Sequence, residues 1–181
     1  KQRLKLLLQH NVIRSLLDII RYHNEDREVL NAAVRSIGNL LTCSNDGEVQ
    51  IISKIIENGV LAVFAHLLSS NVNDKVQREI CWSLSNIAAD NSRWTPLMIE
   101  CGLLPVMVQI VSSAKFELRK EAVWVLSNIT SYKDAQHVRY LVQTGAIRAL
   151  CDMLEVASTG HMKHGLKICV LEAIENILAV G

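Results

Sequence analysis

The sequence predicts an all-α protein made of consecutive repeats, on the evidence of a recurring motif, a recurring glycine and the spacing of its apolar residues. The motif is Trp-x-x-x-Asn, which occurs at Trp82 and Asn86 and again 42 residues later at Trp124 and Asn128. Residues four apart share one face of an α-helix, so both copies present the same pair of side chains. Self-similarity at a fixed period of this length is typical of stacked helical repeats.

Glycines divide the apolar runs at nearly the same period. Gly59, Gly102 and Gly145 follow one another at intervals of 43 residues, and Asn11 takes the corresponding place one repeat earlier. Gly, and less often Asn, adopts the left-handed conformation that ends one helix and turns the chain into the next. Each of these residues is therefore expected to separate two helices within a repeat.

Apolar residues three and four apart predict the helices themselves. Each repeat is expected to hold two short helices and one long one, and no segment has the pattern of a strand. Short helices are expected after the junctions over 13–17, 60–68, 104–111 and 147–154, and long ones over 27–41, 75–89, 117–130 and 166–179.

An all-helical repeat of about 42 residues with three helices is the pattern of an armadillo array, a right-handed superhelical solenoid. HEAT repeats are the neighbouring alternative. The chain opens in mid-pattern and without Met, so it is expected to be a fragment of a longer protein, forming one armadillo-repeat domain. About four three-helix repeats fit, approximately at 1–43, 44–90, 91–131 and 132–181.

Composition narrows the classes of function. Of the 181 residues, 50% are hydrophobic and 20% charged, which is ample for a buried core. The net charge of +1 offers no general field for nucleic acid or a membrane surface. No apolar stretch approaches about 18 residues, the length of a membrane-spanning helix. Five scattered cysteines without Cys-x-x-Cys spacing argue against a disulfide or zinc framework and indicate a reducing compartment.

Catalytic and metal-binding motifs are missing from the sequence. It contains no Gly-x-Ser-x-Gly, phosphate loop or dinucleotide fingerprint. His161 and His164 lie in a Gly/Ser/Thr-rich stretch without a third ligand at suitable spacing, so they are interpreted as surface residues rather than a metal site. We therefore expect neither an enzyme nor a bound cofactor or metal.

The four long helices align on an asparagine, although Asn is a mediocre residue for a helix interior. One interpretation is that each amide bonds to the adjacent repeat. The other is that its acceptor and two donors hold the N–H and C=O of an extended peptide, at roughly three peptide residues per repeat. The aligned residues are Asn39, Asn86, Asn128 and Asn176.

The repeated tryptophans predict which peptide would bind. A large ring one turn from a polar Asn is expected on the surface that lines the array, whereas Trp94, which has no counterpart in the other repeats, is interpreted as core. The rings of Trp82 and Trp124 would accept the stem of a Lys or Arg and face its charge, worth about 0.5–2 kcal/mol each. Glu79 and Glu121, three residues before each Trp, would pair with the cation or be ordinary solvated charges.

Arg35 takes the position that the tryptophans hold in the later helices. It would repel a Lys side chain there, or donate to the ligand's carbonyl groups. The slots for Lys or Arg are therefore expected around Trp82 and Trp124, in a short groove between Arg35 and Asn128.

These helices resemble the C-terminal armadillo repeats of importin α (karyopherin α). The resemblance covers nearly the whole chain, and its specificity comes from two Trp-x-x-x-Asn units preceded by one Arg-x-x-x-Asn. Two loops, over 42–50 and 157–167, are longer than the family's pattern, and Glu172 stands where a fourth slot residue would be sought. The matching stretches are 34–39, 78–88, 119–130, 140–142, 150–154 and 175–178.

The resemblance implies a nuclear import adaptor that shuttles between cytoplasm and nucleus and binds basic nuclear localisation signals of cargo proteins. This segment would hold the family's minor site, and importin β and an export receptor would bind the full-length protein. By motif position the peptide-binding residues would be Trp82 and Trp124 in the Lys/Arg slots, Asn39, Asn86 and Asn128 on the peptide backbone, Glu121 on a basic side chain, and Ser85 and Thr42 as neighbouring polar contacts.

Two other functions fit parts of the sequence. A catenin-like armadillo scaffold for adhesion or signalling would hold acidic peptides in its groove, and Arg35, Arg78 and Lys120 are its best support. A purely structural solenoid would satisfy its asparagines internally. The nuclear import adaptor is the leading prediction because it accounts for both the tryptophans and the asparagines.

Overall fold

The computed structural model describes Leu6 and residues 9–22, 25–43, 51–158 and 164–180. Every regular element in those ranges is helical, which confirms the all-α prediction. Residue contacts divide the chain into two compact units, Lys1–Ser83 and Leu84–Gly181. Residues 44–50 and 159–163, which include His161 and most of the two long loops expected from the sequence, lie outside the described residues.

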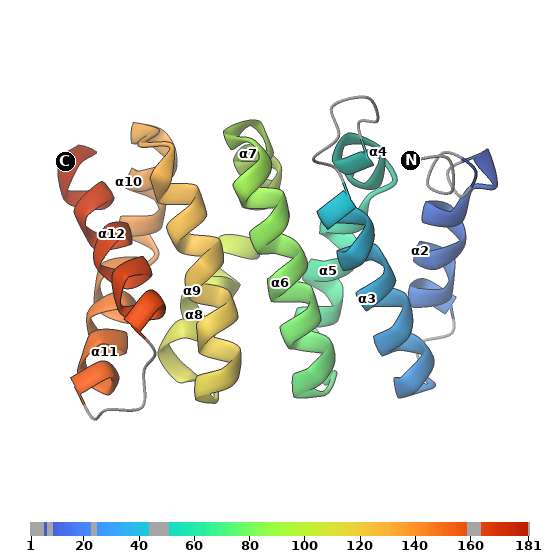
Figure 1. Cartoon of the computed structure of the whole chain (residues 1–181), viewed down its shortest axis with the longest axis horizontal. Helices are drawn as coiled ribbons and strands as arrows, with labels where there is room; N and C mark the ends of the chain where they lie inside the picture. Colours follow the sequence, from blue (N-terminus) through green and yellow to red (C-terminus); the bar gives the residue numbers. More distant parts are fainter. Residues whose placement is uncertain (1–5, 7–8, 23–24, 44–50, 159–163, 181) are drawn as a thin grey trace. The chain divides into compact units, whose positions relative to one another are not determined.

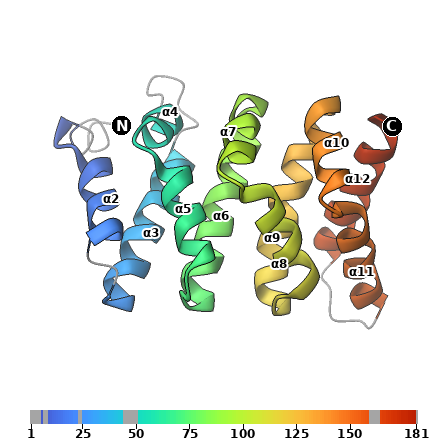
Figure 2. The same cartoon turned by 180° about the vertical axis from the view of Figure 1, so that it is seen from behind.

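Among its described residues the first unit contains four complete helices of the numbered set and the beginning of a fifth, which continues into the second unit. Within it, α2 packs against α3 and α5, and α4 packs against the same two helices. The long helix α3 faces the viewer in Figure 1, and the shorter α2 and α5 face the viewer in Figure 2. The helices are α2 (Val12–Tyr22), α3 (Arg27–Thr42), α4 (Ile51–Glu57), α5 (Val60–Ser69) and α6 (Asp74–Asp90).

The second unit repeats this arrangement. Its long helix α9 packs against α8 and α12, and α11 packs against α8 and α12. Within this unit the long helices α9 and α12 lie on one side, and α8 and α11 lie on the other (Figures 1 and 2). The elements after α6 are η2 (Ser92–Trp94), α7 (Thr95–Glu100), α8 (Leu103–Ser113), α9 (Phe116–Ser131), α10 (Ala135–Gln143), α11 (Ala146–Ser158) and α12 (His164–Val180).

The helix predictions are confirmed to within a few residues, because the apolar spacing that predicts each helix is also what its packing requires. The long helix expected over 27–41 is Arg27–Thr42, and the short one expected over 60–68 is Val60–Ser69. In α9, the described side chains of Ala122, Val123 and Leu126 are fully buried. The repeat boundaries derived from the sequence stay a prediction.

The predicted junctions have the left-handed backbone that their residue types allow. The φ angles are +84° at Gly59, +70° at Gly102 and +88° at Gly145, and +55° at Asn11. Each one directly precedes a helix, α5, α8, α11 and α2 respectively. The chain can therefore turn sharply between two helices of a repeat without a longer loop.

Carboxylate caps fix the starts of two helices. Asp26 Oδ1 accepts hydrogen bonds from the backbone N–H groups of α3, and Asp134 Oδ1 does the same at α10 from Gln136 and His137. The bond from the His137 N–H is the main reason that the pKa of Asp134 lies below its ordinary value. Such caps satisfy donors that the first turn of a helix leaves unpaired.

Among the described residues, no single helix is both long enough and apolar enough to cross a membrane. Two pairs of consecutive helices, α4 with α5 and η2–α7 with α8, reach the required length and apolar composition only when the two members are counted together, and each pair is bent at its junction.

Replacing a junction glycine by alanine is expected to have a measurable conformational cost. A Cβ at Gly102 would meet no heavy atom within 4 Å, so Gly102→Ala changes only the backbone preference at φ +70°. We expect it to lower the free energy of unfolding by about 1–2 kcal/mol in urea titrations followed by circular dichroism. Gly165→Ala is the matched control: it also faces open space but without a positive φ, and should leave stability unchanged or raise it by up to about 1 kcal/mol. Equal losses in both variants would contradict the conformational explanation.

Candidate functional site

Arg35 of α3 and Glu79 of α6 form an ion pair inside the first unit. Arg35 Nη1 lies 3.7 Å from Glu79 Oε1; the Arg35 side chain is 60% exposed and the Glu79 side chain only 16%. Glu79 is therefore a shielded carboxylate with a cation of its own chain beside it, and not an ordinary solvated charge. With one partner largely exposed, such a pair is worth about 0.2–1 kcal/mol. An incoming cation could exchange with Arg35 at little cost.

Trp82 lies against the backbone of α3 at Gly38. A Cβ on Gly38 would stand 2.5 Å from Cζ3 and 2.9 Å from Cε3 of the ring, and 2.8 Å from Ser83 Oγ. The ring is consequently partly buried, with one edge against α3. Sequence reasoning missed the role of Gly38, although a glycine inside a strong helical pattern is itself a signal of close packing.

Asn39 and Thr42 are both exposed near the end of α3. Thr42 Oγ1 donates to the backbone carbonyl of Asn39 at 2.8 Å, so its hydroxyl hydrogen is used within the helix. The Thr42 oxygen can still accept, and the Asn39 amide reaches solvent. The first unit thus brings Arg35, Glu79 and Trp82 to neighbouring positions, with Asn39 and Thr42 further along α3.

Trp124 is the largest exposed side chain of α9. It is 42% exposed, whereas its neighbours Val123 and Val125 are fully buried. Trp94, by contrast, is 9% exposed, and its Nε1 donates to Asp90 Oδ2 at 2.8 Å. The core interpretation of Trp94 is therefore confirmed, while the ring of Trp124 is open to a ligand.

Asn128, one turn after Trp124, bonds to the preceding long helix. Its Nδ2 donates to the backbone carbonyl of Ser85 on α6 at 2.9 Å. This is the contact with the adjacent repeat that the sequence left open as one interpretation of the asparagines. The bond fixes the plane of the amide and leaves Oδ1 and the second N–H for another partner. Ser85 is buried, and its carbonyl serves as the anchor.

Asn86 lies one residue further along α6 and differs from Asn128. Its Nδ2 is buried and has no hydrogen-bond partner among the described residues. A buried donor left unpaired costs about 1–3 kcal/mol, and most such groups in folded proteins have a partner. The repeated asparagines therefore share a position but not a bonding state.

Tyr132 extends the contact between α9 and α6. Its hydroxyl donates to the backbone carbonyl of Ala89 at 2.8 Å. Burial, and next the charge of Asp90, raise the pKa of Tyr132 above its ordinary value, so the hydroxyl keeps its proton and stays a donor. Sequence analysis missed this residue, because a lone Tyr after a helix has no distinctive spacing.

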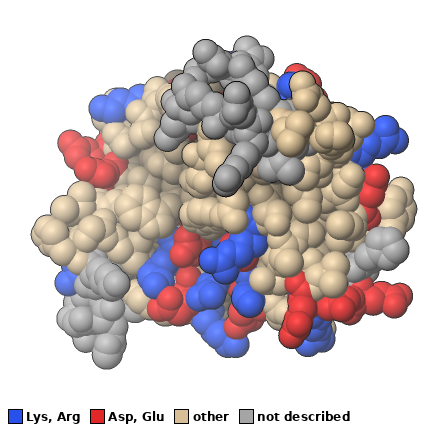
Figure 3. All heavy atoms as spheres, turned by 45° about the vertical axis from the view of Figure 1, so that its right-hand side comes forward, with Lys and Arg blue, Asp and Glu red and all other residues tan. Residues whose placement is uncertain are grey.

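The charged side chains near Trp124 are themselves engaged. Lys120 Nζ lies 2.6 Å from Glu117 Oε2 and 5.7 Å from the centre of the Phe116 ring. Glu121 is half-buried and takes part in interactions within the chain. On the face shown in Figure 3, Lys and Arg side chains are interspersed with Asp and Glu. Among the described residues, this face therefore carries no large area of a single charge sign.

Comparisons with known proteins agree with this geometry. The family model of the armadillo/beta-catenin-like repeat matches residues 49–89 and 95–131. A designed armadillo repeat protein made for modular peptide recognition superposes with a TM-score of 0.84 at 25% identity, covering 100% of this chain and 71% of that one. A second designed armadillo repeat protein gives a TM-score of 0.83 at 25% identity, covering 99% of this chain and 70% of that one. The fold is an all-α armadillo solenoid, as predicted.

Sequence relatives are importin α subunits. The chain is 32% identical over 117 residues to importin subunit alpha-6 of Arabidopsis thaliana, which is 64% of this chain and 21% of that protein. It is 35% identical over 104 residues to the probable importin subunit alpha-A of Dictyostelium discoideum, 57% of this chain and 18% of that protein. The matched segment thus spans about a fifth of the length of these curated relatives.

The close contact between Gly38 and the Trp82 ring can be tested by adding a methyl group at position 38. Gly38→Ala is expected to displace the Trp82 ring and to lower the free energy of unfolding by about 1–3 kcal/mol, the usual cost of overpacking. The double variant Gly38→Ala/Trp82→Ala should lose much less than the sum of the single variants, because the displaced ring is then absent. Urea unfolding of all three gives the coupling. Additive losses would contradict the contact as the cause.

Proposed function

We propose that this importin-α-like armadillo region binds Lys/Arg-rich peptides, nuclear localisation signals among them, in extended form along its long helices. The observation that carries the proposal is Trp124: a 42% exposed ring one turn before Asn128 and one turn after Glu121. An exposed aromatic face beside a carboxylate and an oriented amide has what a basic side chain on an extended backbone needs.

The ring and the carboxylate act on different parts of a basic side chain. The methylene stem of Lys or Arg lies against the indole, and the cation above the ring is attracted to its electron-rich face. Glu121 then offers a half-shielded carboxylate for the charged end, where charge-assisted hydrogen bonds are stronger than in open water. Together they favour a cation over a neutral or acidic side chain.

The asparagine amides supply the contacts that do not depend on peptide sequence. Asn128 is held by the Ser85 carbonyl, so its remaining amide groups are oriented before a peptide arrives. Asn86 has a donor without a partner, and after rotation of its amide a peptide carbonyl would satisfy it. Preorganised groups lower the entropic cost of binding.

In the first unit the same chemistry involves an exchange of cations. Glu79 already pairs with Arg35 at 3.7 Å, and Trp82 lies one turn further along α6. A basic side chain of the peptide would replace Arg35 beside Glu79, and the freed guanidinium would stay in solvent.

The wider role follows from what the relatives are called. Several are named importin α subunits, so the proposed role is a nuclear import adaptor that moves between cytoplasm and nucleus. It would act by binding, without catalysis. Association with importin β and with an export receptor belongs to the same proposal and concerns the full-length protein.

An acidic-peptide scaffold of the catenin kind is the rival. Two of the three cations that favour it in the sequence are paired within the chain, Arg35 with Glu79 and Lys120 with Glu117. A bound acidic peptide would have to compete with these carboxylates. The structure therefore gives the rival less support than the sequence did.

Removal of either ring should weaken basic peptides. Trp124→Ala and Trp82→Ala are each expected to lower the affinity for a fluorescein-labelled Lys-rich signal peptide by about twofold to thirtyfold, the range of one cation–π contact. Fluorescence anisotropy measures this at constant ionic strength. Leu178→Ala, an exposed apolar truncation on α12, is the control and should bind as the parent chain does. The proposal fails if both Trp variants keep full affinity, or if a Glu-rich peptide binds more tightly than the Lys-rich one.

Arg35 provides a second test, in which the sign of the change is informative. If Arg35 competes with the ligand for Glu79, then Arg35→Gln should raise the affinity for the Lys-rich peptide by up to about fivefold. Glu79→Gln should lower it by a similar factor. A fall in affinity for Arg35→Gln would instead mean that Arg35 contacts the ligand, and would contradict the exchange.

A further inference from the structure

A cavity of about 390 Å³ opens between the outer helices of the first unit, α2 and α5. It lies within the range of roughly 300–1,000 Å³ that is usual for ligand pockets. Its floor is apolar: Ile20 of α2 is fully buried, and Leu67 and Val63 of α5 are 2% and 9% exposed. Ala62 also lines it, and this small side chain leaves space open beside the floor.

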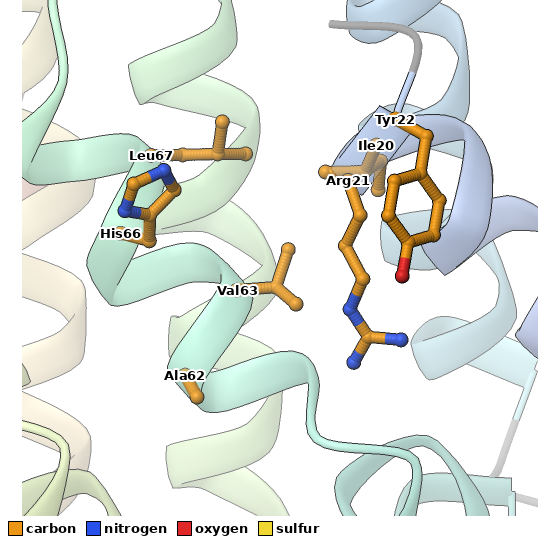
Figure 4. Close-up of a pocket in the computed structure, with 7 residues that line it drawn as sticks. All are labelled: Ile20, Arg21, Tyr22, Ala62, Val63, His66 and Leu67. Atoms are coloured by element: carbon orange, nitrogen blue, oxygen red, sulfur yellow. The ribbon is translucent and has the colours of Figure 1, made fainter.

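The last residues of α2 form the other wall. Figure 4 shows the Arg21 stem and the Tyr22 ring side by side, with Val63 pointing toward them from α5. Tyr22 is 75% exposed, the highest value among the large hydrophobic side chains of the described residues. A ring left in water at the edge of an apolar cavity is typical of a residue that becomes covered on binding, and Tyr and Arg are enriched at such positions.

The polar groups of this α2–α5 cavity favour an anion. Arg21 and His66 line it, and no carboxylate is among its lining residues in the described structure. Arg21 Nη2 donates to the Asn58 carbonyl at 3.1 Å, and Nη1 lies 3.7 Å from Asp18, outside the cavity lining. A guanidinium has five N–H donors, so these two contacts hold it in place and leave donors for a ligand.

We propose that the α2–α5 cavity is a second peptide-binding site, which takes a short acidic segment of a partner protein. One aromatic or branched aliphatic side chain of the segment would lie on Ile20, Val63 and Leu67, against the Tyr22 ring. A carboxylate next to it in the segment would pair with Arg21, with His66 as a further hydrogen-bond partner. The chemistry is opposite to that of the proposed basic-peptide site, because here the chain presents the cation.

The shape of the cavity supports a peptide side chain as the occupant. The apolar floor needs an apolar group, and the guanidinium at its edge, already 3.7 Å from Asp18, has further N–H donors for a second carboxylate close to that group. A basic segment would meet Arg21 unfavourably, and a purely apolar one would cover the remaining Arg21 donors without offering them acceptors. A segment with alternating acidic and apolar residues meets both requirements.

Three matched peptides test the inference by fluorescence anisotropy: fluorescein-labelled Gly-Asp-Leu-Phe-Asp-Gly, its Asn analogue and its Lys analogue. The acidic peptide should bind the chain about fivefold more tightly than the Asn analogue, and the Lys analogue should bind least. Equal affinities for the three, or preference for Lys, would overturn the proposal.

Variants then locate the binding. Ala62→Glu places a carboxylate in the cavity at an exposed position and should abolish binding, and Arg21→Met should weaken it about threefold to fivefold. Arg14→Met, an exposed arginine of α2 that does not line the cavity, is the matched control. Unchanged affinity in Ala62→Glu would overturn the proposal even if Arg21→Met failed to fold.

The test of the α2–α5 cavity can succeed or fail independently of the basic-peptide proposal. Trp124→Ala should leave the acidic peptide's affinity unchanged, because Trp124 belongs to the other unit and to the other site. If Trp124→Ala removed acidic-peptide binding while Ala62→Glu kept it, the acidic peptide would occupy the long helices, and the cavity inference would be wrong.

Discussion

The structure depends on one constraint: the apolar stripes of these helices can be buried only by neighbouring helices. Helix α9 packs against α8 and α12, and its Val123, Val125 and Ile129 are fully buried. Half of the α9 side chains are buried in this way, and the others are left to face solvent or a ligand. Trp124 and Asn128 are among these others because they do not belong to the packed face. Recognition chemistry on this fold is thus a consequence of how its core is built.

The two copies of the Trp-x-x-x-Asn motif differ in their surroundings. Trp82 packs against α3 at Gly38, which has no side chain. The ring can therefore lie close to the α3 backbone and is partly buried. Trp124 keeps 42% of its surface exposed. The glycine one residue before Asn39 is replaced by Ser85 and Ser127 in the next two long helices. The two proposed slots would therefore differ in depth, and need not share one preference for Lys or Arg.

Features that depend on local conformation could be predicted from the sequence, and features that depend on packing between repeats could not. Gly59, Gly102 and Gly145 were identified because a left-handed junction needs a particular residue type at one position. The Arg35–Glu79 ion pair and the bond from Asn128 to Ser85 join residues more than 40 positions apart. The repeat period places such residues near each other, but it does not say which of several polar groups will bond.

The proposed selection of basic peptides does not require a large net charge, because it rests on individual charges that are already paired inside the chain. The net charge is +1, and a surface with so little field attracts neither sign from a distance. Glu79 is held by Arg35, and Lys120 by Glu117. In the proposed exchange, a ligand cation that displaces Arg35 would gain a shielded carboxylate and an adjacent ring, and would break only a pair worth about 0.2–1 kcal/mol. Most of the proposed selectivity would then come from the aromatic contact and the shielding, both of which need a close fit.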